Sequence, residues 1–95
     1  MNIEISPDAA EWFKREYDIE GETNFRFFVR YGGVGGNVPG FSLGVNIETP
    51  SSIHASQEID DLLFYIEEQD AWYFDEKDLL VTLDEDLGEP QFSYQ

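Results

Sequence analysis

Residues 24–47 contain two alternating segments on either side of a glycine-rich loop, and this arrangement constrains the fold most strongly. In the first segment, NFRFFVRY, the side chains of Phe25, Phe27 and Val29 fall on one face. The second segment, FSLGVNI, alternates apolar and small or polar residues in the same way. A period of two residues is typical of β-strands, whose successive side chains point to opposite faces. We therefore expect the two segments to pair as a wide hairpin around the loop.

The chain before this hairpin predicts a short strand and then the principal helix. The opening MNIEI alternates as a strand does. Ser6 is a favourable N-cap, and Pro7 suits the first helical position because its missing N–H would have no partner there. Asp8 lies near the positive end of the helix dipole, and Gly21 ends the helical pattern.

The chain after the hairpin predicts further strands and one helical turn. Residues 48–57 are rich in turn formers and are interpreted as a linker. The apolar run at 62–66 predicts a strand buried on both faces, and Trp72 anchors a predicted helical turn. Two more strands are expected at 79–83 and 91–95. The predicted class is α+β, built mainly on antiparallel sheet.

Length and charge limit both the organisation and the partners. The 95 residues predict a single domain, residues 1–95, with a hydrophobic core that includes many of the 15 aromatic side chains. The 21 acidic residues outnumber the 5 cationic ones, which gives a net charge of −16. Such a surface repels phosphate backbones and anionic lipids, so neither nucleic acid nor membrane is an expected partner. With no secretory signal or membrane-spanning run, we expect a cytoplasmic protein.

Metal-binding and catalytic residues are scarce. The chain has no cysteine, which removes thiolate nucleophiles and cysteine-ligated metals. His54 lies among serines without a recognisable nucleophile spacing, and residues 84–89 lack the ligand spacing of a calcium loop. We therefore expect no enzyme activity, no cofactor and no resident metal. Six acids around Trp72 are interpreted as a solvated face rather than a weak cation site: Glu67, Glu68, Asp70, Asp75, Glu76 and Asp78.

The glycine loop and the cations before it form the candidate binding site. Arg26 and Arg30 project from one strand face and could clamp an anionic ligand, although pairing with neighbouring acids is the favoured interpretation. The loop lacks the Lys–Ser/Thr pair of a nucleotide-binding loop and precedes a strand rather than a helix. It is interpreted as a lid, a dimer contact or part of a ligand site. The candidate ligand- or partner-binding residues are Arg26, Arg30, Tyr31, Gly32, Gly33, Val34, Gly35 and Gly36.

The order of these segments resembles the HesB/IscA-like family of A-type iron–sulfur cluster carriers. The resemblance covers ISPDAAEWFK, NFRFFVRYGGVGG, GFSLGV and the segment from LLFYIEEQ to the C-terminal QFSY. It implies a β-sandwich of mixed and antiparallel strands with one principal N-terminal helix and a short second helix. Family members bind iron through cysteines, but Val34 stands at the position of the loop cysteine and no Cys-Gly-Cys follows Phe92. The resemblance therefore implies a cysteine-free branch that has lost the carrier chemistry.

Three functional hypotheses follow. The leading one is a non-enzymatic HesB-like binding or adaptor protein, related to iron–sulfur cluster biosynthesis, that contacts a protein partner or a small ligand through the loop from Tyr31 to Phe41 and the neighbouring Arg30. The alternative is an iron or iron–sulfur protein whose ligands are His54, carboxylates or residues lent by a partner. A hydrolase is the third. Association into a homodimer is left open, because exposed aromatics would favour it and the charge of −16 would oppose it.

Overall fold

The computed structural model describes residues 1–33 and 35–95, so the prediction for Val34 lies outside the described residues. Within these described residues, seven strands, one α-helix and one short 3₁₀ helix follow one another. They are β1 (Ile3–Ile5), α1 (Pro7–Glu16), β2 (Thr23–Tyr31), β3 (Phe41–Ile47), β4 (Ile53–Ile59), β5 (Leu62–Glu67), η1 (Glu68–Phe74), β6 (Leu79–Asp84) and β7 (Glu89–Tyr94).

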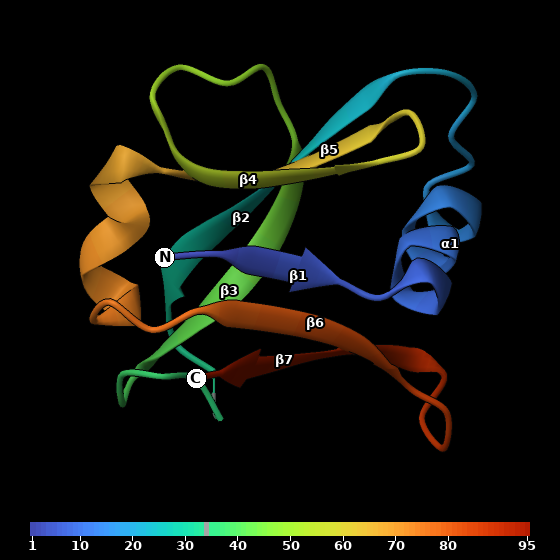
Figure 1. Cartoon of the computed structure of the whole chain (residues 1–95). Helices are drawn as coiled ribbons and strands as arrows, with labels where there is room; N and C mark the ends of the chain where they lie inside the picture. Colours follow the sequence, from blue (N-terminus) through green and yellow to red (C-terminus); the bar gives the residue numbers. More distant parts are fainter. Residues whose placement is uncertain (34) are drawn as a thin grey trace.

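The strands form two sheets that pack against each other. One sheet has three strands in the order β1-β6-β7, and the other has four in the order β3-β2-β5-β4. Figure 1 shows α1 at one end of the two sheets and η1 at the opposite end. The expected class, mainly β within α+β, with a principal N-terminal helix and a short second helix, is confirmed.

The β2–β3 hairpin forms as the alternation predicted. The two strands are antiparallel, and their register runs without interruption from Phe25 opposite Ile47 to Tyr31 opposite Phe41. The ring of Phe28 lies over Gly44, which is opposite Phe28 in the register. Any side chain at position 44 would collide with this ring. The glycine thus lets an aromatic ring cover the backbone of its neighbour strand.

The core between the sheets and α1 is built from aromatic rings. Phe13 of α1 is buried, and its ring lies 5.4 Å from that of Phe64 on β5 and 5.5 Å from that of Phe25 on β2. Phe25 and Phe64 stack with their centroids 5.2 Å apart. Phe27 is equally buried and contacts Phe92 of β7 across the two sheets. Rings of this size supply most of the apolar area that stabilises so small a domain.

The start of α1 also agrees with the sequence. Ser6 is the N-cap, and its Oγ accepts a hydrogen bond of 3.2 Å from the backbone N–H of Ala9. Pro7 occupies the first turn. The helix ends at Glu16, a turn earlier than Gly21, because Tyr17 is the C-cap and Asp18 adopts a positive φ of 51°.

One expectation about the strands was wrong. Residues 48–57 are not only a linker, since β4 begins at Ile53 and pairs antiparallel with β5. Its alternation is weak because Ala55 is the only fully buried residue of this strand. The expectation of mixed, mainly antiparallel strands is confirmed: among the described strands three pairs are antiparallel, whereas β1 pairs with β6 and β2 with β5 in parallel. Both parallel pairings join segments distant in sequence, which local patterns do not encode.

Candidate functional site: an exposed aromatic face beside the glycine loop

Three aromatic side chains meet at the surface where the β2–β3 hairpin approaches η1. Tyr31 ends β2 and is 88% exposed, whereas Trp72 of η1 is 55% exposed. Phe41, at the start of β3, lies between them, with ring centroids 5.7 Å from Tyr31 and 5.3 Å from Trp72. Both contacts are edge-to-face, a geometry that aromatic rings prefer. We call Tyr31, Phe41 and Trp72 the aromatic face.

Asn37 and Tyr73 hold the loop behind this face in place. The backbone N–H of Asn37 donates to the hydroxyl of Tyr73 at 2.7 Å, and its Nδ2 donates to the carbonyl of Tyr73 at 2.8 Å. Lys77 Nζ donates to Oδ1 of Asn37 at 3.1 Å. Because Tyr73 is fully buried in the core, these hydrogen bonds attach the loop to the core of the protein.

Tyr94 and Gly36 complete the same junction. The Tyr94 hydroxyl lies 3.1 Å from that of Tyr73, and burial together with this hydrogen bond raises the pKa of Tyr94 far above its usual range. The Tyr94 phenol therefore stays neutral near pH 7. A Cβ at Gly36 would collide with the carbonyl oxygen of Phe41 and with the Tyr73 hydroxyl. Glycine is needed at this position because the loop backbone runs directly against both groups.

Arg26, a predicted site residue, is a structural cation and not an open clamp. Its guanidinium contacts Glu48 at 2.7 Å and Asp70 at 3.0 Å, as the favoured interpretation expected. Burial lowers the pKa of Arg26, but the hydrogen bonds to the two carboxylates outweigh this, and the net shift is upward. The side chain is only 13% exposed, and within the described residues its Nε has no hydrogen-bond partner. The pairing fastens η1 to β2.

Arg30, Tyr31 and the loop glycines lie away from Arg26. Arg30 Nε donates to Ser42 Oγ at 3.1 Å, and the described part of the chain gives Arg30 no salt bridge. It is exposed next to Tyr31, so these two residues remain candidates for a surface contact. The fold therefore divides the predicted set: Arg26 is in the interior, and Arg30, Tyr31, Gly32, Gly33, Gly35 and Gly36 are at the end of the hairpin.

Trp72 was missed in the predicted site, whereas Phe41 entered it only as the end of the glycine loop. Trp72 lies 41 positions after Tyr31, and only the docking of η1 beside the hairpin brings them together. The sequence signal for Trp72 was its position as a large aromatic residue in a short acidic helix that has no apolar stripe. A large ring in such a segment is a frequent surface anchor.

Two of the six acids that were expected to form a solvated face, Glu67 and Asp70, are buried instead and have structural roles. Glu67 accepts backbone hydrogen bonds from Ser51 at 2.8 Å and Ser52 at 2.6 Å. The bond from Ser51 is the main cause that lowers the pKa of Glu67. His54 Nδ1 lies 3.2 Å from Glu68, an ion pair only when the imidazole is protonated. In residues 1–33 and 35–95, no three potential ligands gather as a metal site.

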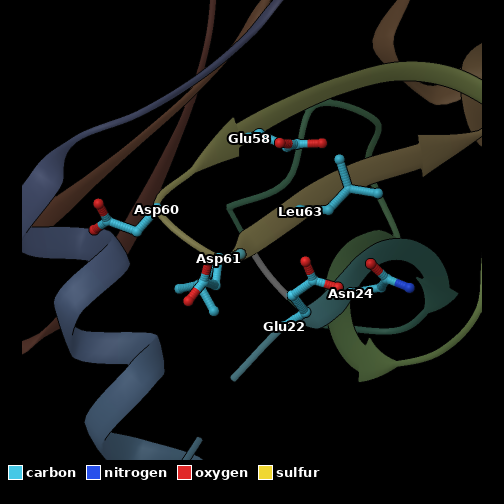
Figure 2. Close-up of a pocket in the computed structure, with 7 residues that line it drawn as sticks. Glu22, Asn24, Glu58, Asp60, Asp61 and Leu63 are labelled. Atoms are coloured by element: carbon cyan, nitrogen blue, oxygen red, sulfur yellow. The ribbon is translucent and has the colours of Figure 1, made fainter. Parts of the chain in front are cut away.

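A concave region next to the turn between β4 and β5 is strongly acidic. Figure 2 shows Glu58 at the end of β4, Asp60 and Asp61 in the β4–β5 turn, and Glu22 just before β2 around one hollow of about 220 Å³. No cationic side chain lines it. This hollow extends the negative surface and does not suit an anionic ligand.

Fold and site together define a small acidic α+β domain with an exposed, braced aromatic face. The chain is 50% identical to the pyruvate dehydrogenase inhibitor of Bacillus subtilis over 95 residues, which is the full length of both. It is 33% identical to an uncharacterized protein of Staphylococcus saprophyticus over 98% of each chain. An uncharacterized protein of Staphylococcus haemolyticus is 36% identical over 85% of each. The chain belongs to the family of these proteins.

The resemblance to iron–sulfur cluster carriers is corrected by these relatives. The chain matches no known family profile, and no solved structure matches it. Its full-length relative in Bacillus subtilis is named for pyruvate dehydrogenase inhibition, so neither the HesB-like assignment nor the iron–sulfur functions hold. The resemblance rested on the order of a helix, a hairpin and a glycine loop. Backbone geometry alone can produce that order, so it does not establish ancestry.

Location was the remaining expectation from the sequence. In the part of the chain that the structure describes, no helix has the length and apolar character required to cross a membrane. The cytoplasmic location remains a prediction.

Proposed function

We propose that this protein inhibits pyruvate dehydrogenase by binding to it, without catalysing a reaction. The observation that carries the proposal is the full-length identity of 50% with the Bacillus subtilis pyruvate dehydrogenase inhibitor. An identity at this level, without gaps at either end, supports a shared binding mode. The inhibitor is then a stoichiometric protein ligand, and its potency depends on a contact surface and not on a reaction site.

The aromatic face is the proposed contact surface. Tyrosine and tryptophan are enriched among the residues that dominate binding energy in protein interfaces. Tyr31 and Trp72 are exposed, yet they are held by Phe41 and by the bonds between Asn37 and Tyr73. Rings that already contact one another lose less conformational freedom on binding than isolated side chains would, which favours affinity.

Charge supports a basic region on the partner. The net charge of −16 is distributed over both ends of the domain, including the acidic hollow near Asp60 and Asp61. Complementary charges raise the association rate and suppress binding to acidic proteins. We therefore expect inhibition to weaken as salt rises, through a slower association rate.

The experiment is a titration of purified pyruvate dehydrogenase with this protein, using the Bacillus subtilis inhibitor as the positive control. The expected result is saturating inhibition at stoichiometric amounts. Tyr31→Ala and Trp72→Ala are each expected to weaken inhibition about 30-fold, the equivalent of a hot-spot loss of about 2 kcal/mol. Leu87→Ala is the matched control, because Leu87 is an exposed apolar residue in the β6–β7 turn, outside the aromatic face.

Two outcomes would contradict the proposal. If this protein fails to inhibit while the positive control does, the function is wrong. If inhibition persists in the Tyr31 and Trp72 variants and falls in Leu87→Ala, the function stands and the contact surface is elsewhere. Circular dichroism of each variant separates a lost contact from a lost fold.

A further inference from the structure

The β3 edge presents backbone groups that no strand of the described chain satisfies. Glu48 N–H donates to the Asn24 carbonyl at 3.2 Å, and Gly32 N–H donates to that of Gly40 at 2.7 Å. These bonds fix which positions of the antiparallel β2–β3 pair are hydrogen-bonded, since such positions alternate. The N–H and C=O groups of Leu43 and Val45 therefore point away from β2, toward the open edge.

The facing strand, β7, is also an edge. Asp78 and Gln95 exchange backbone hydrogen bonds of 2.7 and 3.0 Å, so the same alternation directs the backbone of Phe92 away from β6. β3 and β7 belong to different sheets and are not paired with each other. Pro90 has no N–H to donate and protects the β7 edge from strand addition.

A groove of about 420 Å³ lies between these two edges. Its lining combines aromatic and aliphatic side chains from α1, β3 and β7 with one cation, Arg30, and one acid, Glu89. Trp12 is fixed in this lining because its Nε1 donates to the Gly88 carbonyl at 2.7 Å. The groove is therefore largely apolar, and it runs beside backbone N–H and C=O groups of β3 that have no strand partner.

We propose that the β3 edge binds an extended, basic segment of pyruvate dehydrogenase as an additional strand, with alternate apolar side chains seated in this groove. The proposal rests on the proposed function and names where and how the partner is recognised. Strand addition draws its affinity from main-chain hydrogen bonds and its specificity from side-chain pockets, and this edge offers both. The surrounding charge of −16 favours a basic segment over an acidic one.

Other sheet edges are less suitable. β4, the opposite edge of the same sheet, is crossed by β1, whose Ile5 N–H donates to Gln57 Oε1 at 2.6 Å. Its pairing is also irregular between Ile53 and Ala55. β3 has neither proline nor lysine and keeps an unbroken register over seven residues. It therefore lacks the features by which edge strands usually prevent strand addition.

The groove and the aromatic face lie along the same strand. Phe41 begins β3 and belongs to the aromatic face, whereas Val45 lies four residues farther along and lines the groove. A segment paired with β3 would thus extend from the groove to Tyr31 and Trp72. This continuity makes one polypeptide partner a better occupant than a small molecule confined to the groove.

The test compares hydrogen–deuterium exchange of the full chain, free and bound to purified pyruvate dehydrogenase, at single-amide resolution. We expect the amides of Leu43 and Val45 to exchange rapidly in the free protein and to become protected in the complex. The amides at the β4 edge, residues 53–59, are the internal control and should not gain protection. This measurement needs no variant and so does not depend on variant folding.

A proline at position 45 tests the same contact by inhibition. Val45→Pro removes an outward backbone N–H that the β2–β3 pairing does not use. Val45→Thr keeps this backbone N–H and replaces the side chain by one of similar shape. The expected loss for Val45→Pro is at least about tenfold in inhibition, and for Val45→Thr less than about twofold. Circular dichroism and thermal unfolding check that Val45→Pro remains folded.

The outcomes separate the two proposals. If pyruvate dehydrogenase is inhibited but Leu43 and Val45 stay unprotected in the complex, strand addition is overturned and the proposed function stands. If protection appears and Val45→Pro, when folded, loses inhibition, strand addition is supported. If the enzyme does not bind the wild-type chain at all, both proposals fail together.

Discussion

Loss of the Arg26 guanidinium should destabilise the protein more than loss of Glu48, the more exposed of the two carboxylates that it contacts. Asp70 is 9% exposed in its side chain and Glu48 is 41% exposed. Arg26→Met leaves the Asp70 carboxylate buried without its cation, a change that costs roughly 3–5 kcal/mol in comparable sites. Glu48→Gln removes only a half-exposed partner and should cost less than about 1 kcal/mol.

Urea unfolding followed by tryptophan fluorescence measures the free energy of unfolding of both variants, and thermal unfolding measures their Tm. In a domain of this size, 1 kcal/mol corresponds to roughly 4–8 °C in Tm, so Arg26→Met should lower Tm by more than about 12 °C. Replacing Asp70 by leucine in the Arg26→Met background should recover part of the loss, because the carboxylate that lost its cation is then removed. Equal, small losses for Arg26→Met and Glu48→Gln would refute the reasoning that Asp70 depends on Arg26.

Two further changes test the junctions around the site. Because hydrogen bonds lower the pKa of Glu67 below its ordinary 4.5, its contribution to stability is present above that pH and is lost as pH falls through the folded-state pKa. The Tm should therefore fall less steeply between about pH 6 and pH 3 in Glu67→Gln than in wild type. Parallel curves of Tm against pH for the two proteins would contradict this. Gly36→Ala forces a methyl group against Phe41 and Tyr73 and should cost about 1–3 kcal/mol in urea unfolding. An unchanged midpoint would show that the loop has room there.

Local features of the fold were predictable because they depend on neighbours in sequence. The Ser6 N-cap and the β2–β3 hairpin follow from capping and alternation. β4 was missed because its strand character depends on pairing with β5 and only Ala55 is fully buried. The sequence did not indicate which strands pair in parallel, since no local pattern reports which distant strand lies alongside.

The candidate site was predictable only in part. The sequence identified Tyr31 and the glycines but gave Arg26 and Arg30 the same role. Their difference comes from Asp70, 44 residues after Arg26, which η1 carries to one guanidinium and not to the other. Trp72 joins the aromatic face through the same docking of η1. Side chains that meet only in the folded chain were beyond the reach of sequence spacing.

The central claim is that this protein binds and inhibits pyruvate dehydrogenase through the end of the domain that carries Tyr31 and Trp72. The most direct measurement is enzyme activity against increasing inhibitor for wild type, the Tyr31→Ala/Trp72→Ala double variant and Leu87→Ala. The account predicts complete inhibition near one equivalent for wild type and Leu87→Ala, and little inhibition by the folded double variant. Full enzyme activity at a large excess of the wild-type chain, alongside an effective Bacillus subtilis inhibitor, would contradict it.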